Sequence, residues 1–206
     1  MHPDANQSIS PLDRQPGGYT GGMSNPGRAK RREALKRVAV ALKDSDIPFA
    51  LMGGYAVWAR GGPESEHDVD FLVAEADSAK AAELLRDRGF EVEQPPEDWL
   101  FKVWTDNTMV DIIFRCSGVP AQRADVDAAD EIEVLSVTMP VLDATEIVVQ
   151  KLTSMDEHAC DFGAVLPMAR ALREQVDWSH VRTRSQDNDF AVAFLVLLER
   201  LGIVDP

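Results

Sequence analysis

Hydrophobic residues recur at every second position in several short segments of the first two thirds of the chain. Successive side chains of a β-strand point to opposite faces, so this alternation, with the short apolar runs beside it, predicts strands. The predicted strands cover residues 48–52, 69–74, 90–93, 99–105, 109–114, 131–134 and 136–139. Asp106 and Asn107 lie between two of these segments and predict a hairpin turn.

In the last third of the chain, hydrophobic residues recur every three to four positions, which is typical of amphipathic helices. Asp143 and Glu146 form a capping box that predicts the start of one helix. The predicted helices cover residues 29–44, a short segment after Gly54, 78–88, 143–155, 162–175, 178–184 and 188–201. We therefore expect an α+β fold, with a mixed β-sheet and flanking helices followed by a small helical subdomain.

Composition divides the chain into three parts. Residues 1–26 are rich in proline and glycine and poor in apolar residues, so we expect a disordered tail there. Residues 27–140 hold the predicted strands and form the expected core domain. Residues 141–206 carry only helical periodicity and form the expected helical subdomain.

The formal net charge of the chain is −14. This charge argues against a broadly basic nucleic-acid-binding surface and suits a polycationic small molecule or a basic partner protein. Arginines and lysines cluster between residues 28 and 37, where a solvated helix face is the simplest interpretation. The sequence shows no membrane-spanning apolar run, no signal peptide and only two isolated cysteines, so we expect a cytoplasmic protein that does not contact a membrane.

Most of the candidate functional residues lie between residues 49 and 73, where Gly53-Gly54 follows one predicted strand and Asp68-Val69-Asp70 begins the next. Side chains at positions i and i+2 of a strand share a face, so the two carboxylates project together. Paired carboxylates repel unless a cation lies between them, and hard oxygen ligands suit Mg²⁺, with Mn²⁺ as an alternative. The glycines allow the backbone to approach a phosphate closely. The segment therefore predicts metal-dependent nucleotide chemistry.

This segment resembles the DNA polymerase β-like nucleotidyltransferase superfamily, whose pattern is an apolar residue, Gly-Gly or Gly-Ser, a spacer and Asp-x-Asp within a strand. The resemblance implies transfer of a nucleoside monophosphate from an NTP to an acceptor hydroxyl, with release of pyrophosphate. The family's third carboxylate lies on a later strand, and Asp111 in Met109–Phe114 matches it. Asp68 and Asp70 would then hold one or two metal ions, while Asp111 would complete the site and take the acceptor proton.

Three further residues are candidates for binding the nucleotide, together with Gly53 and Gly54. Lys151 lies within a predicted helix, where its ammonium either covers apolar surface or reaches the NTP phosphates. Nucleotidyltransferase toxins of the AbiEii and MenT type carry a lysine on the helix after the sheet and an aspartate near the start of the next helix, an order that Lys151 and Asp161 fit. Arg60 ends the helix after Gly54 and suits either the helix dipole or the nucleotide.

The acceptor is less well defined by the sequence. The second half resembles toxin-type enzymes that add nucleotides to the 3′ end of tRNA and pair with an antitoxin, and we favour this acceptor slightly. The Gly-Gly-Tyr-Ala and Glu-His-Asp-Val-Asp motifs are also similar to aminoglycoside and lincosamide nucleotidyltransferases. A catalytically inactive, nucleotide-binding regulatory partner is the third alternative. Metal-dependent NTP turnover separates the third alternative from the two enzymes.

Overall fold

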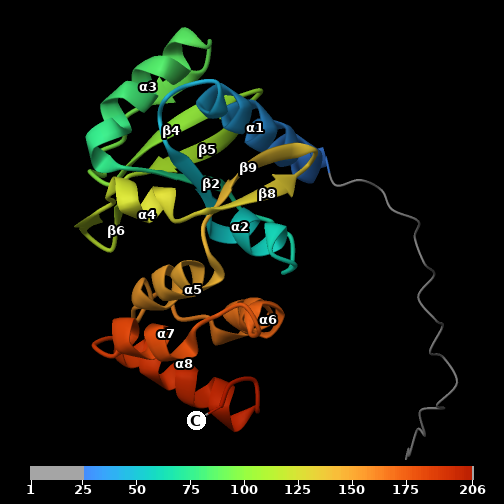
Figure 1. The fold of residues 1–206 in the computed structure, drawn as a ribbon, viewed down its shortest axis with the longest axis vertical. Coiled ribbons are helices and arrows are strands. Elements are labelled where there is room, and N and C mark those ends of the chain that lie inside the picture. Colours follow the sequence, from blue (N-terminus) through green and yellow to red (C-terminus); the bar gives the residue numbers. More distant parts are fainter. Residues whose placement is uncertain (1–25, 206) are drawn as a thin grey trace, which may run out of the picture.

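A seven-stranded mixed sheet forms the centre of the upper part of the molecule (Figure 1). The computed structural model describes residues 26–205, so the predicted tail lies outside the described residues except for Pro26, which begins the first helix. The strands follow the spatial order β3-β4-β5-β2-β1-β9-β8. Their bounds are β1 (Phe49–Met52), β2 (Val69–Val73), β3 (Glu91–Glu93), β4 (Leu100–Thr105), β5 (Thr108–Ile113), β8 (Asp130–Val134) and β9 (Val137–Val141).

The central strands explain why the sheet is mixed. β1 pairs antiparallel with β2, whereas β2 pairs parallel with β5 and β1 pairs parallel with β9. The predicted hairpin is confirmed, because β4 and β5 pair antiparallel around Asp106 and Asn107. These two residues have φ of 50° and 58°, the left-handed conformation that a two-residue turn between twisted strands requires.

Helices pack around the sheet and then form a separate group below it (Figure 1). All four residues of β1 are buried, which means that both faces of the sheet are covered at its centre. Helix α1 packs on α3 and on β5, while α2 packs on β1 and β2. The helices are α1 (Pro26–Lys43), α2 (Gly53–Ala59), α3 (Ser78–Asp87), α4 (Arg123–Asp127), α5 (Ala144–Thr153), α6 (Phe162–Leu172), α7 (Trp178–Ser185) and α8 (Asp189–Arg200).

Local signals explain most helix starts. The carboxylate of Asp143 accepts a hydrogen bond from the Glu146 backbone N–H at 2.8 Å, so the predicted cap of α5 is present. Asp161, Asp177 and Asn188 cap α6, α7 and α8 in the same way. Among the described residues, no helix is both long enough and apolar enough to cross a membrane.

Some short elements were not predicted. They are α4, the single-turn helix η1 (Glu75–Asp77) and the two-residue strands β6 (Arg115–Cys116) and β7 (Val119–Pro120). The strands β6 and β7 form a small separate ribbon around Ser117 and Gly118, both with positive φ. Such short elements carry too few residues for hydrophobic periodicity to indicate them.

Candidate active site

The site begins where β1 ends and α2 starts. Gly53 has φ of +62°, and a Cβ atom built on it would lie 2.0 Å from Oδ2 of Asp70. The antiparallel register pairs Met52 with Asp70, which places this carboxylate directly against the start of α2. Only glycine fits at position 53, because any side chain would displace the Asp70 carboxylate.

The three predicted carboxylates come from neighbouring positions of the sheet. Asp70 and Asp111 are direct partners in the parallel pairing of β2 with β5, and paired strands lie about 5 Å apart. Asp68 precedes the first residue of β2 and is exposed. The structure therefore brings Asp70 and Asp111 side by side at the sheet centre, with Asp68 at the rim.

Electrostatics show that these carboxylates share one environment. Burial raises the pKa of Asp70 to about 7, and the negative charges of Asp111 and Asp68 add to the effect. Lys151 and Lys102 act in the opposite direction on the same group. The pKa of Asp111 is also raised, chiefly by burial, while the neighbouring Lys102 counteracts the shift. A region of concentrated, only partly compensated negative charge results.

Lys102 is a site residue that the sequence interpretation missed. Its Nζ atom lies 3.3 Å from Oδ1 of Asp111, across the pairing of β4 with β5. The signal was present in the sequence, because a two-residue turn at Asp106 and Asn107 fixes the hairpin register. Counting outward from that turn along both strands places Lys102 opposite Asp111.

The donor chemistry of this cluster fits a divalent cation. Asp68, Asp70 and Asp111 supply only hard oxygen atoms. Burial, and then the negative charges of Asp111 and Asp68, raise the pKa of Asp70, and a bound cation would offset those charges. Within residues 26–205, however, no three histidine, cysteine or acidic side chains already converge as a closed metal-binding set. Oδ1 of Asp111 contacts Lys102 instead, which leaves its second carboxylate oxygen without a contact to that lysine.

A cavity of about 1060 Å³ opens over Asp68 and Asp70. Its floor includes Gly53 and Gly54, and its walls come from the loop before β2, the ends of β4 and β5, and helices α5 and α6. A Cβ atom on Gly54 would lie 2.6 Å from Oγ of Ser65, so this glycine allows the loop to approach α2 closely. The volume is at the upper end of that of small-molecule sites, about 300–1,000 Å³.

Lys151 lies on α5 and lines this cavity, with its side chain exposed. Its positive charge acts on Asp70 and favours the ionised form of that carboxylate. The structure therefore places Lys151 over the cavity that contains the carboxylates. Its predicted contact with the nucleotide stays a prediction, as does that of Gly53 and Gly54.

Arg60 has a structural role in the fold, and its predicted contact with the nucleotide stays a prediction. Its side chain is only 8% exposed, and its Nη2 atom lies 2.6 Å from the carboxylate of Asp130. It also donates to the backbone oxygens of Leu142 and Val141, at 2.6 Å from Nε and 3.0 Å from Nη2. Arg60 therefore joins α2 to the end of β9 and is not part of the cavity wall. The sequence shows that Arg60 ends a helix, but it does not show which carbonyl groups the fold brings beside it.

Asp161 has a capping role in the structure. Its carboxylate accepts a hydrogen bond from the backbone N–H of Ala164 at 3.1 Å, at the start of α6. Ala164 and Val165 line the cavity, whereas Asp161 is exposed outside the lining. A contact between Asp161 and the nucleotide stays a prediction.

Comparisons with known proteins agree with this geometry. Residues 28–205 match the sequence family described as uncharacterised nucleotidyltransferase. No protein with a curated description matches the chain. The antibiotic-resistance factor ANT(2″)-Ia, in a crystal structure in complex with adenylyl-2″-tobramycin, has 14% sequence identity and a TM-score of 0.56 over 82% of this chain and 98% of its own.

Two further solved structures match the chain. The solution structure of ANT(2″)-Ia has 12% identity and a TM-score of 0.58, over 85% of this chain and 98% of its own. The lincosamide adenylyltransferase LnuA, with lincomycin bound, has 13% identity and a TM-score of 0.48, over 66% of this chain and 92% of its own. The predicted mixed sheet with flanking helices is thus the nucleotidyltransferase fold.

Proposed function

The chain belongs to the family of uncharacterised nucleotidyltransferases, and we propose that it transfers a nucleoside monophosphate from an NTP to a hydroxyl of a small cationic molecule, with Mg²⁺ or Mn²⁺ as cofactor. One observation carries this proposal: Asp70 packs on Gly53 at the floor of a cavity, and its pKa responds to both Asp68 and Asp111. A nucleotidyl transfer site needs this concentration of carboxylates beside a backbone that phosphate can approach.

Each residue has a defined role in this proposal. Asp68 and Asp70 would hold the metal, which supplies positive charge to the triphosphate when bound. Lys151 would bind the phosphates from α5, opposite the carboxylates. Asp111 would accept the proton of the acceptor hydroxyl, whose oxygen forms the new bond to the α-phosphorus as the bond to pyrophosphate breaks.

The charge around the cavity favours a cationic acceptor. Glu66 and Asp68 line the cavity and are exposed to solvent, whereas Glu64, which also lines it, is paired with Arg28 and Arg32. The net charge of −14 attracts cations over longer distances as well. An acceptor with amino groups would therefore be drawn into the cavity, beside Asp70. Asp111, the strand partner of Asp70, lies outside the cavity lining.

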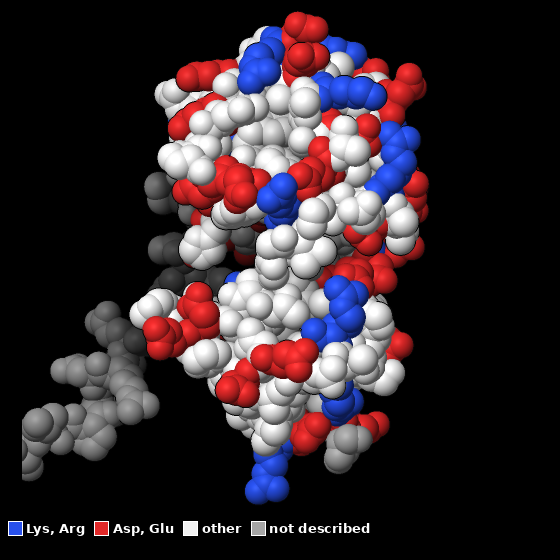
Figure 2. Space-filling model, turned by 90° about the vertical axis from the view of Figure 1, so that its left-hand side faces the viewer, with Lys and Arg blue, Asp and Glu red and all other residues white. Residues whose placement is uncertain are grey.

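The basic residues that could contact an RNA acceptor, between residues 28 and 37 and in the last third of the chain, are largely engaged in ion pairs. On the face shown in Figure 2, blue and red side chains are interspersed. Paired arginines offer less positive charge to a phosphate backbone, which weakens the case for tRNA. The relevant pairs are Arg28–Glu64, Arg32–Glu64, Arg37–Asp106, Arg173–Glu174, Arg182–Glu199 and Arg184–Glu146. The tRNA acceptor with an antitoxin partner stays a prediction.

The structure of ANT(2″)-Ia, which is similar in fold, supports the proposal of a small-molecule acceptor. The ANT(2″)-Ia structure contains adenylyl-2″-tobramycin, a nucleotidylated small molecule, and that enzyme spans nearly its whole length in the superposition. Because the sequence identity is 14%, the likeness supports the fold, and the acceptor proposal rests on the cavity charges.

Transfer of radiolabel from each of the four α-³²P-labelled NTPs to three acceptors tests the proposal. The acceptors are tobramycin, lincomycin and bulk tRNA, each with Mg²⁺, with Mn²⁺ and with EDTA. We expect metal-dependent labelling of a small molecule, and loss of labelling in EDTA. Labelling of tRNA alone would support the toxin alternative instead. Absence of any metal-dependent NTP turnover would support the inactive regulatory partner.

A further inference from the structure

One wall of the cavity carries an aromatic and an aliphatic side chain, whereas the floor carries carboxylates. Trp99 lines it with 41% of its surface exposed, and Ile113 lines it beside the end of β5. The Trp99 carbonyl oxygen accepts hydrogen bonds from the backbone N–H groups of Phe114 at 2.9 Å and Arg115 at 3.2 Å. The backbone that carries the indole is therefore fixed by these hydrogen bonds, and the exposed part of the indole is available to a ligand in the cavity.

Sheet topology places this wall on the acceptor side of the site. The strand order is β4-β5-β2-β1, so Gly53 at the end of β1 and Trp99 before β4 lie on opposite sides of Asp70. Ile113 is two residues after Asp111 on β5 and shares its face. With phosphates at Gly53 and a proton acceptor at Asp111, the attacking hydroxyl has to come from the side of Ile113 and Trp99.

An aromatic side chain lines this wall, and a negative charge lies beside it. Glu97, two residues before Trp99, is exposed to solvent outside the cavity lining, and its carboxylate makes a minor contribution to the electrostatics of Asp111. Arg115 also lines the wall, but its guanidinium is paired with Glu75 at 2.7 Å and Asp98 at 3.2 Å. An indole face binds an apolar ring face or a cation, and a neighbouring carboxylate favours an ammonium group.

We propose that Trp99 and Ile113, with Glu97 beside them, form the acceptor subsite, and that Trp99 selects an acceptor whose hydroxyl is carried by a ring bearing amino groups. This inference rests on the proposed nucleotidyl transfer and assigns one wall of the same cavity to the acceptor. The floor at Gly53 and Gly54, together with Lys151 from α5, would bind the nucleotide.

Two binding measurements on the full chain, made without turnover, test this assignment. Dissociation constants are measured for tobramycin and lincomycin, two hydroxylated ring compounds with amines, and separately for Mn²⁺ with each α,β-methylene NTP. In Trp99→Ala we expect the affinity for the ring compound to fall about tenfold, the scale of a lost cation–π or stacking contact. The nucleotide affinity should change less than about twofold. Trp99→Phe should keep most of the ring affinity, and Glu97→Gln should weaken it in a salt-sensitive way.

Trp104→Ala is the matched control. Trp104 lies on β4, the strand that follows Trp99, outside the cavity lining, and donates a hydrogen bond to Glu93 at 3.0 Å. It should leave both dissociation constants unchanged.

Weaker nucleotide binding by Trp99→Ala, with unchanged binding of the ring compounds, would assign this wall to the base of the nucleotide and overturn the inference. So would a wild-type protein that binds neither ring compound, or one that binds tRNA through Trp99. Failure of nucleotidyl transfer itself would appear separately, as lost binding of Mn²⁺ with nucleotide.

Discussion

Asp70 is the residue on which the site depends most, because it touches the α2 backbone, pairs with Asp111 across the sheet and responds to Lys151. A carboxylate with a pKa of about 7 in the folded protein, against an ordinary value of 3.8, binds its proton more tightly when the chain is folded. Stability therefore falls as pH rises between these two values, since the unfolded chain loses the proton first.

The first prediction follows from this shift. In the absence of metal, Asp70→Asn should stabilise the protein above pH 7 by on the order of 2 kcal/mol, because each pKa unit corresponds to about 1.4 kcal/mol. The gain should shrink as the pH falls toward 5, where Asp70 is itself protonated. Thermal unfolding at pH 5, 7 and 8.5 measures the difference. A variant that is less stable than wild type at every pH would show that Asp70 is not destabilised by its surroundings.

The second prediction concerns the role of Lys151 in binding the NTP phosphates. If its ammonium binds the triphosphate, Lys151→Ala should raise the KM for NTP and lower kcat by tenfold or more, an estimate of roughly 1.4 kcal/mol or more in transition-state stabilisation. Thermal stability should hardly change, because the side chain is exposed. Lys80→Ala on α3, also exposed, is the control for removal of one positive charge. Normal kinetics with a lower melting temperature would assign Lys151 to covering apolar surface.

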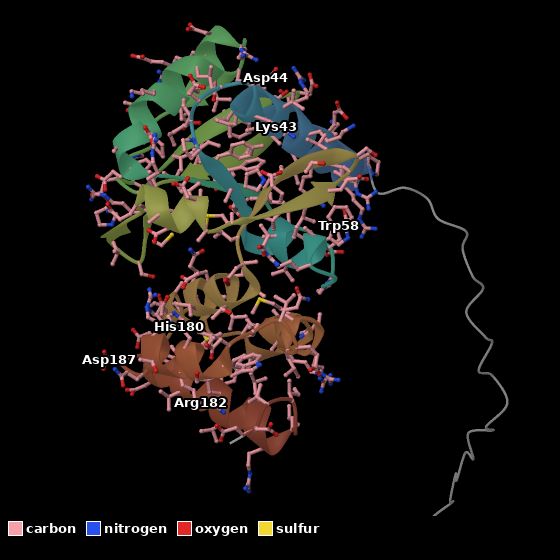
Figure 3. All side chains as sticks on the ribbon, in the orientation of Figure 1. Lys43, Asp44, Trp58, His180, Arg182 and Asp187 are labelled. Atoms are coloured by element: carbon pink, nitrogen blue, oxygen red, sulfur yellow. The ribbon has the colours of Figure 1, made fainter. Side chains whose placement is uncertain are left out.

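At the scale of elements, α1 holds the loop that leads into the aspartate pair. The guanidinium of Arg32 donates to both carboxylate oxygens of Glu64, at 2.8 and 2.7 Å. It also lies 5.0 Å from the ring centre of Trp58, which projects from α2 toward the start of α1 (Figure 3). The Glu64 side chain is only 10% exposed, and the paired arginine lowers its pKa. This forked pair fixes the loop four residues before Asp68.

The third prediction concerns this connection. Arg32→Ala and Glu64→Ala should be coupled by about 1 kcal/mol in a double-mutant cycle of unfolding free energies. Both should also weaken the binding of Mn²⁺ with nucleotide, since the loop that carries Asp68 would be less restrained. The pair Arg88–Asp44, at 3.5 Å with both side chains exposed, should show almost no coupling. Equal coupling in the two cycles would mean that the forked pair has no special role.

Several elements were predictable from local signals, and others were not. The hairpin at Asp106 and Asn107 and the cap at Asp143 depend only on neighbouring residues, and both are present. Gly53 and Asp70 were predicted from their motif, and the structure adds that one packs on the other. Arg60 could not be placed, because its carbonyl partners lie about eighty residues away in the sequence. Lys102 was predictable from the hairpin register. A lysine at an alternating position of a strand is, however, more commonly interpreted as a residue on the solvent-exposed face.

At the scale of the whole molecule, the cavity is shared by the sheet and the helical group. Its floor comes from β1 and β2, whereas Lys151 and Met168 come from α5 and α6. The two parts are also joined by the hydrogen bond from Gln175 to the Arg60 carbonyl, at 2.9 Å. The division at residue 140 into a core and a helical subdomain stays a prediction. A nucleotide bound in the cavity would contact both parts and stabilise their arrangement.

Binding of Mn²⁺ in the presence of α,β-methylene NTPs tests the central claim most directly, because it requires no knowledge of the acceptor. Electron paramagnetic resonance of free Mn²⁺ counts the bound ions in wild type and in the Asp68→Asn, Asp70→Asn double variant. We predict saturable binding of one or two ions per chain with at least one of the four nucleotides, and loss of that binding in the double variant. Absence of binding to wild type with every nucleotide, or equal binding by both proteins, would contradict a metal-dependent nucleotidyl transfer site at these carboxylates.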